Sequence, residues 1–178
     1  MQLLQKQLQP YPEKVSDYYR ELKNLGLNYG KNFQGIQQIW VGDNRALGYI
    51  KLPENLVDRT KDKLHPALLD ACFQLVGVAI RRDRGLYLPV GLDSLSLYQT
   101  GCNSVWAYLQ LQENNGQIQA DLQLFDDNNL IVADIRGLSL QYLNQQSLAK
   151  LIAATTVKED LNDWLYEVVW EDSENGDK

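Results

Sequence analysis

The longest apolar segment of the chain lies at residues 64–80 and predicts a buried helix. Pro66 suits the first turn of a helix, where its missing N–H costs no hydrogen bond. The apolar residues that follow cover nearly the whole circumference of such a helix, and a helix that is apolar all round is usually buried. The segment is too short and too interrupted to span a membrane, which needs about 20 apolar residues.

Two polar side chains, Asp70 and Gln74, interrupt this apolar surround. At a spacing of four residues they share one face of the helix. Burying a lone carboxylate is costly, so the fold must give Asp70 a partner, keep it protonated or open a cleft to it. The spacing alone fits a side chain that reaches solvent, a structural hydrogen bond and a working carboxyl, since buried acids serve both structure and sites.

Before the central helix the pattern predicts a helix and a β-hairpin. Apolar residues recur at helical spacing over 13–25, and Gly26 follows as a stop signal. Two strands are expected over 34–42 and 45–52, because Gly-Asp-Asn between them is typical of a hairpin turn. Residues 53–63 are polar and are expected to form the loop that leads into the central helix.

Beyond the central helix, apolar and polar residues alternate, which is typical of half-buried strands. We expect an α+β fold in which about five to seven antiparallel strands curve around helix 65–80. Such a sheet must cover something apolar, and this helix is the only large candidate. The strands of this region are predicted near 95–97, 105–111, 118–124 and 131–142.

The chain of 178 residues fits a single domain with tails. Residues 1–12 are expected to form a lead-in and residues 13–154 the domain itself. Residues 145–153 are expected to form a short helix at its end. The segment 155–178 is acidic and is expected to be a linker or tail that is partly disordered.

Composition removes several classes of function. The formal net charge of −6 argues against general nucleic-acid binding, which requires a basic surface. The two cysteines have neither metal-site nor disulfide spacing, so no metal is expected, and this usage suits a reducing cytoplasm. The N-terminus lacks the apolar core of a signal peptide, and no membrane partner is expected.

Three motifs resemble, in the same order, those of polyketide synthase dehydratase domains. The sequence YGKNFQGI at 29–36 resembles their YGxxFQG segment, and HPALLDACFQ at 65–74 resembles their HPALLDAxxQ segment. LPV at 88–90, followed by Leu95, is similar to their LPF…L segment and is the third motif. In addition to these three, the closing LYEVVW at 165–170 is similar to the exit from such domains. The departures are Lys31 in place of proline and Val90 in place of phenylalanine.

This resemblance implies one half of a double hotdog, the C-terminal half. In the family, a histidine within an HxxxGxxxxP motif of the first half removes the α-proton of the substrate. The aspartate that matches Asp70 donates a proton to the departing β-hydroxyl, and the residue at Gln74 helps to hold acid and substrate. The substrate is a β-hydroxyacyl chain on the phosphopantetheine of an acyl carrier protein, with no bound cofactor.

Further substrate-binding positions follow from the same motifs. Considered alone, Tyr29 fits a packing residue and Gly35 fits a turn. The positions that the resemblance implies are Tyr29, Phe33, Gly35, Pro66, Leu88 and Pro89.

The base of the family's reaction is missing from this chain. His65 is the only histidine, and its spacing from Asp70 puts it off the helix face that Asp70 uses. We therefore expect a half that is inactive alone and needs its N-terminal hotdog or neighbouring synthase domains. Two alternatives are a non-catalytic remnant with a docking role, and a self-sufficient hotdog isomerase, cyclase or thioesterase that gains its second catalytic group by forming a homodimer.

A basic cluster at Arg81, Arg82 and Arg84 follows the central helix. Cations at this end of a helix complement its dipole, which stabilises it by about 0.3–1 kcal/mol. The alternative is a docking site for the acyl carrier protein, because a guanidinium group matches the geometry of a phosphate.

Overall fold

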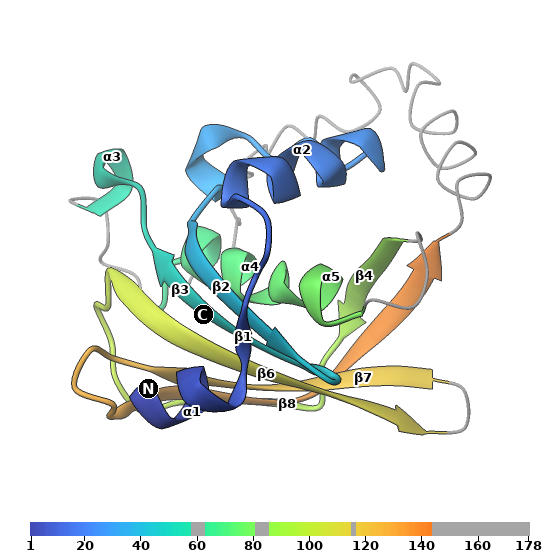
Figure 1. The fold of residues 1–178 in the computed structure, drawn as a ribbon. Helices are drawn as coiled ribbons and strands as arrows, with labels where there is room; N and C mark the ends of the chain where they lie inside the picture. The colour runs from blue at the N-terminus through green and yellow to red at the C-terminus, as the bar shows by residue number, and fades with distance from the viewer. Residues whose placement is uncertain (58–62, 81–85, 115–116, 144–178) are drawn as a thin grey trace, which may run out of the picture.

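The computed structural model describes residues 1–57, 63–80, 86–114 and 117–143. A curved antiparallel sheet wraps around two short consecutive helices, α4 (Pro66–Phe73) and α5 (Leu75–Ala79) (Figure 1). Residues of both helices are buried against apolar residues of the concave face of the sheet. The predicted arrangement, a sheet curved around the apolar segment 65–80, is confirmed.

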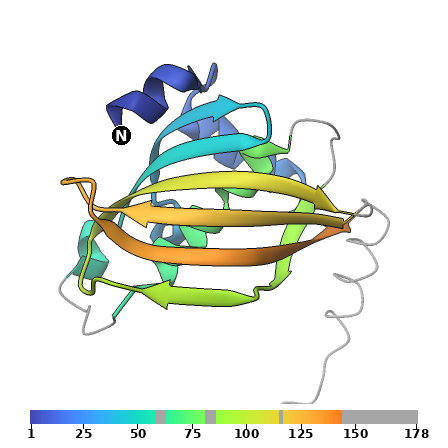
Figure 2. The same cartoon turned by 90° about the horizontal axis from the view of Figure 1, so that it is seen from below.

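The sheet has eight strands among the described residues, in the order β1-β2-β3-β6-β7-β8-β4, and β5 also pairs with β8 (Figure 2). The expectation of five to seven was too low, because strands at both edges had no alternating pattern. The strands are β1 (Gln9–Pro10), β2 (Ile36–Gly42), β3 (Arg45–Lys51), β4 (Leu86–Gly91), β5 (Ser94–Leu97), β6 (Ser104–Asn114), β7 (Gln117–Phe125) and β8 (Ile131–Leu143).

The two faces of the sheet follow the alternation in the sequence. In β6, Val105, Ala107 and Leu109 are completely buried on the side of the central helices. Trp106 lies on the opposite face, where its ring is 4.8 Å from that of Tyr49 on β3. A side-chain period of two therefore separates the core from the outer surface.

The central helix is interrupted at Gln74, whereas the sequence predicted one helix over 65–80. The Tyr18 hydroxyl donates a 2.6 Å hydrogen bond to the main-chain carbonyl of Gln74. The N–H of Gly77 bonds to the same carbonyl at 3.2 Å, a tighter closure than that of an α-helix. A side chain inserted into the hydrogen-bond ladder is a recognised cause of a helix break, and apolar periodicity carries no sign of it.

The predicted helix over 13–25 is confirmed as α2 (Val15–Asn24), which lies over the central helices on the side away from the sheet (Figure 1). Gly26, with φ of 101°, follows its end. Residues 1–12, expected as a lead-in, contain α1 (Gln2–Gln7) and β1, which pairs with β2. The expected loop over 53–63 contains α3 (Glu54–Val57), and a 3-10 turn, η1, spans Lys31–Phe33.

Several sequence expectations lie outside the described residues. These are the arginine cluster Arg81, Arg82 and Arg84, the short helix over 145–153, the tail over 155–178 and the motif at 165–170. Within the described part of the chain, no helix has the length and apolarity to cross a membrane. The same residues hold no group of three or more His, Cys, Asp or Glu side chains placed to bind a metal ion.

Candidate active site

A cavity of about 620 Å³ lies between α2, the central helices and β4. Its walls are mixed, with apolar contributions from Leu25, Phe73 and Ile80 and polar ones from acidic and tyrosine side chains. The cavity brings together five of the predicted site residues, which come from three separate segments of the chain. They are Tyr29, Asp70, Gln74, Leu88 and Pro89.

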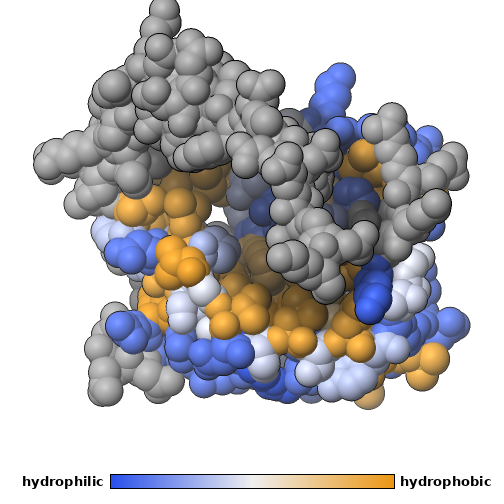
Figure 3. Space-filling view, turned by 180° about the vertical axis from the view of Figure 1, so that it is seen from behind, coloured by the Kyte–Doolittle hydropathy of each residue, from blue (hydrophilic) through white to orange (hydrophobic). Residues whose placement is uncertain are grey.

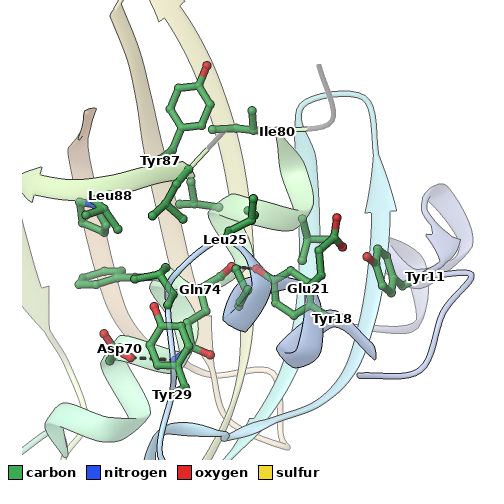
Figure 4. Close-up of a pocket in the computed structure, with 18 of the residues that line it drawn as sticks. Tyr11, Tyr18, Glu21, Leu25, Tyr29, Asp70, Gln74, Ile80, Tyr87 and Leu88 are labelled. Carbon is green, nitrogen blue, oxygen red and sulfur yellow. Dashed lines mark hydrogen bonds between the residues drawn. The ribbon is translucent and has the colours of Figure 1, made fainter. Parts of the chain in front are cut away.

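The carboxyl of Asp70 is held by the side chain of Gln74. Gln74 Nε2 donates a 2.8 Å hydrogen bond to Asp70 Oδ2 (Figure 4). The two residues stand one helical turn apart, as their spacing in the sequence predicted. Asp70 is half-buried at the wall of the cavity, whereas Gln74 is 6% exposed. The carboxyl is therefore partnered and open to the cavity at the same time.

Three further contacts hold Gln74. Its Nε2 also donates a 2.9 Å hydrogen bond to the main-chain carbonyl of Phe33. Its Oε1 accepts a 3.0 Å hydrogen bond from the Tyr19 hydroxyl, and its own carbonyl accepts from Tyr18. The sequence did not identify Tyr18 and Tyr19 as site residues. In the sequence they contributed only to the helical periodicity that predicted a helix over 13–25. The signal that could have identified them is that each carries a hydroxyl group that can donate a hydrogen bond.

The tyrosines of this region are held in their neutral form. Burial raises the pKa of Tyr29 from 10.0 to about 12, and the charge of Asp70 adds to this effect. Burial also raises the pKa of Tyr18 and of Tyr19 above the usual range of tyrosine. Of the three, Tyr18 and Tyr19 donate hydrogen bonds from their neutral hydroxyls, both to Gln74.

The remaining predicted positions support the site from outside the cavity. A Cβ atom added at Gly35 would lie 3.1 Å from the Cβ of Ala71, so this glycine allows the chain to pass close to α4. The Phe33 side chain is 42% exposed, and only its carbonyl reaches Gln74. Pro66 occupies the first turn of α4, as predicted.

His65 is the N-cap of α4. Its Nδ1 accepts a 3.1 Å hydrogen bond from the main-chain N–H of Ala67. The side chain is therefore occupied in capping the helix, and it does not line the cavity. This agrees with the expectation that it lies off the face used by Asp70.

The wall formed by β4 is also an edge of the sheet. In the described residues β4 and β5 pair with β8 on one side only. Val90 is 63% exposed, Leu92 42% and Leu95 39%. Hydrophobic side chains gather on this side of the molecule (Figure 3). The cavity is thus bordered by an apolar strand edge that has no neighbouring strand in the described part of the chain.

Comparison with known proteins identifies the family. Residues 2–150 match the family model described as polyketide synthase dehydratase N-terminal domain. The chain belongs to the polyketide synthase dehydratase family. Curated relatives include polyketide synthases PksN and PksM of Bacillus subtilis, which are 29% identical over 131 residues and 27% identical over 144 residues. These matches cover 71% and 74% of this chain, but only 2% and 3% of the relatives.

Solved dehydratase structures have the same fold. The dehydratase domain of the CurK module of curacin polyketide synthase is 38% identical, with a TM-score of 0.70. The dehydratase of the CurF module is 36% identical, with a TM-score of 0.69. The CurK match covers 79% of this chain and 50% of the CurK structure, so this chain spans about half of that dehydratase. The fold of this family member is therefore the hotdog that the resemblance implied.

Proposed function

We propose that the chain is the C-terminal hotdog of a modular polyketide synthase dehydratase and that Asp70 is its general acid. The observation that carries this proposal is the carboxyl of Asp70, held at 2.8 Å by Gln74 on the wall of the cavity. A carboxyl that is held in place and open to a cavity can act as a general acid and transfer a proton to a leaving group.

The assignment to the C-terminal half rests on residues rather than on the name of the family model, which specifies an N-terminal domain. The sequence has no HxxxGxxxxP motif, and its one histidine caps a helix. The CurK dehydratase was solved as an inactive aspartate-to-asparagine variant and as an inactive histidine-to-phenylalanine variant. By analogy, this chain supplies the aspartate and a second hotdog supplies the histidine.

The proposed reaction is the elimination of water from a β-hydroxyacyl thioester. The histidine of the partner hotdog removes the α-proton, and the electrons of that C–H bond form the double bond. The C–O bond to the β-hydroxyl breaks, and Asp70 transfers its proton to the departing oxygen, which leaves as water. The carboxylate that remains is stabilised by the hydrogen bond from Gln74 to Oδ2.

The proposed substrate is a β-hydroxyacyl chain on the phosphopantetheine of an acyl carrier protein. A volume of about 620 Å³ is typical of sites for small molecules. Tyr29, Leu88 and Pro89 line the cavity and would contact the acyl chain. The arginines at 81, 82 and 84 lie outside the described residues, and docking of the carrier protein there stays a prediction.

The partner hotdog is proposed to sit against the edge formed by β4 and β5. This edge carries the exposed side chains of Val90, Leu92 and Leu95, and an unpaired apolar strand edge favours association with another chain. Because β4 also forms a wall of the cavity, a partner at this edge could bring its histidine to the substrate. Without that partner, a second copy of this chain is the expected occupant.

Reconstitution tests the proposal. The chain alone should not dehydrate a β-hydroxyacyl carrier-protein substrate, because a missing acid–base partner lowers the rate about 10²- to 10⁴-fold. Addition of an N-terminal hotdog that carries the HxxxGxxxxP histidine should restore turnover, and Asp70→Asn should abolish it with little change in melting temperature. Asp43→Asn, in the exposed β2–β3 turn, is the matched control and should be active.

Two outcomes would contradict the proposal. If the isolated chain turns over the substrate and Asp70→Asn abolishes this activity, the chain is a self-sufficient enzyme. If the reconstituted pair is inactive although it forms a complex, the chain is a non-catalytic remnant.

A further inference from the structure

We propose that Tyr19 is a positioning residue that sets the orientation of the Gln74 side chain and, through it, of the Asp70 carboxyl. The proposal rests on the proposed function for what Asp70 does, but the hydrogen bonds that support it are independent of that function. Tyr19 lies on α2, far in sequence from both residues.

The Tyr19 hydroxyl has only one arrangement that satisfies its two neighbours. The main-chain N–H of Ile36 donates to it at 3.2 Å, and a main-chain N–H can only donate. The single proton of the hydroxyl is therefore free for its other neighbour, Oε1 of Gln74, at 3.0 Å. A carbonyl oxygen can only accept, so the Ile36 N–H donates to the Tyr19 hydroxyl and the hydroxyl donates to Gln74 Oε1.

The opposite end of the Gln74 amide is constrained in the same way. The carbonyl oxygen of Phe33 can only accept, so the Gln74 atom that lies 2.9 Å from it must be the nitrogen. The second proton of that nitrogen points to Asp70 Oδ2 at 2.8 Å. A flipped amide would place its oxygen against two acceptors, so Tyr19 and Phe33 together select the orientation that serves Asp70.

This orientation assigns different tasks to the two carboxyl oxygens of Asp70. Oδ2 accepts a hydrogen bond from the Gln74 amide, so one of its lone pairs is engaged there. Oδ1 is the oxygen that the Gln74 amide leaves unengaged. No hydrogen bond from another described residue reaches Oδ1, so this oxygen is the one available to a substrate in the cavity.

Tyr19 itself is held in a fixed position. Its ring is 6.0 Å from that of Tyr18 and 6.3 Å from that of Tyr29. Tyr18 bonds to the main-chain carbonyl of Gln74, so adjacent residues of α2 hold the backbone and the side chain of the same glutamine. In Tyr19→Phe the ring packing is kept and only the hydroxyl is lost, which makes this variant specific.

Nuclear magnetic resonance of the full chain tests the positioning without any activity. In Tyr19→Phe, the side-chain amide protons of Gln74 should exchange with water about 2- to 10-fold faster, which is the change expected for the loss of one net hydrogen bond. Tyr108→Phe, which removes a hydroxyl from the outer face of β6, should leave this rate unchanged. An unchanged Gln74 exchange rate in a folded Tyr19→Phe variant would overturn the proposal.

A double-mutant cycle in the reconstituted dehydratase tests the effect on the acid. Tyr19→Phe should lower kcat about 2- to 10-fold with little change in KM, and it should have no further effect in a Gln74→Ala background. An equal loss in both backgrounds would mean that Tyr19 acts independently of Gln74 and would overturn the proposal. If the wild-type pair is inactive, the proposed function fails, while the resonance experiment still decides the role of Tyr19.

Discussion

The Tyr18 hydroxyl donates a 2.6 Å hydrogen bond to the main-chain carbonyl of Gln74, at the residue where α4 ends and α5 begins. The side chain of the same glutamine donates to the Asp70 carboxyl. The interruption of the central helix and the candidate acid therefore share one residue. The hydroxyl of Tyr18, which comes from α2, therefore contributes to the geometry of the site at Gln74.

Gly77→Ala should destabilise the protein, although alanine is the better helix former by about 1 kcal/mol. A Cβ atom at this position would lie 2.7 Å from the Tyr18 hydroxyl, which must then leave the Gln74 carbonyl. We expect a loss of about 1–3 kcal/mol in the free energy of unfolding, measured by urea denaturation. Gly30→Ala is the control, because a Cβ there meets nothing within 4 Å. Equal stability of Gly77→Ala and wild type would contradict the close contact.

His65→Ala should lower the free energy of unfolding by about 0.5–2 kcal/mol, because it removes the acceptor for the Ala67 N–H at the start of α4. His65→Asn should restore most of this loss, since an asparagine oxygen accepts the same kind of hydrogen bond. Thermal and urea unfolding of both variants would measure the difference. If His65→Asn is as unstable as His65→Ala, the imidazole has a role beyond the cap.

Stability should fall as the pH rises from 10 to 12. The folded-state pKa of Tyr29 is about 12 against 10.0 for an ordinary tyrosine, so between these values the unfolded chain has lost a proton that the folded chain keeps. The stabilising contribution is complete below pH 10 and is lost as the pH rises towards 12. Urea midpoints over this range should fall less steeply for Tyr29→Phe than for wild type. Equal slopes would show that the Tyr29 hydroxyl ionises with the same pKa in both states.

Val90→Lys together with Leu95→Lys should weaken the association with the proposed partner hotdog without lowering the melting temperature. Both side chains are exposed on the β4–β5 edge, and lysine on a sheet edge opposes pairing with another chain. Sedimentation or titration calorimetry should show at least about tenfold weaker binding, the signature of a lost central apolar contact. Leu130→Lys is the control, since Leu130 is 60% exposed in the turn before β8. Unchanged binding of the double variant would place the partner elsewhere.

Much of the fold could be predicted because periodicity reports burial. The helix over 13–25, the hairpin at 42–44 and the alternating strands from 105 onwards were all predicted and are all present. Strands β1 and β4 were missed because neither alternates, and each depends on a neighbour already in place: β2 for one and β8 for the other. A short edge strand is defined by the strand it pairs with rather than by its own residues.

The candidate site, too, has one part that the sequence predicts and another that depends on the tertiary structure. The sequence by itself determined that Asp70 and Gln74 share a helix face, because a spacing of four residues sets that geometry whatever surrounds the helix. Only the tertiary structure decided that α2 crosses at Gln74, that Tyr18 interrupts the helix there and that Tyr19 orients the amide. These hydrogen bonds join residues that are 55 or 56 positions apart in the sequence. They form because the fold brings the two groups together, and the periodicity of the sequence contains no information about such a contact.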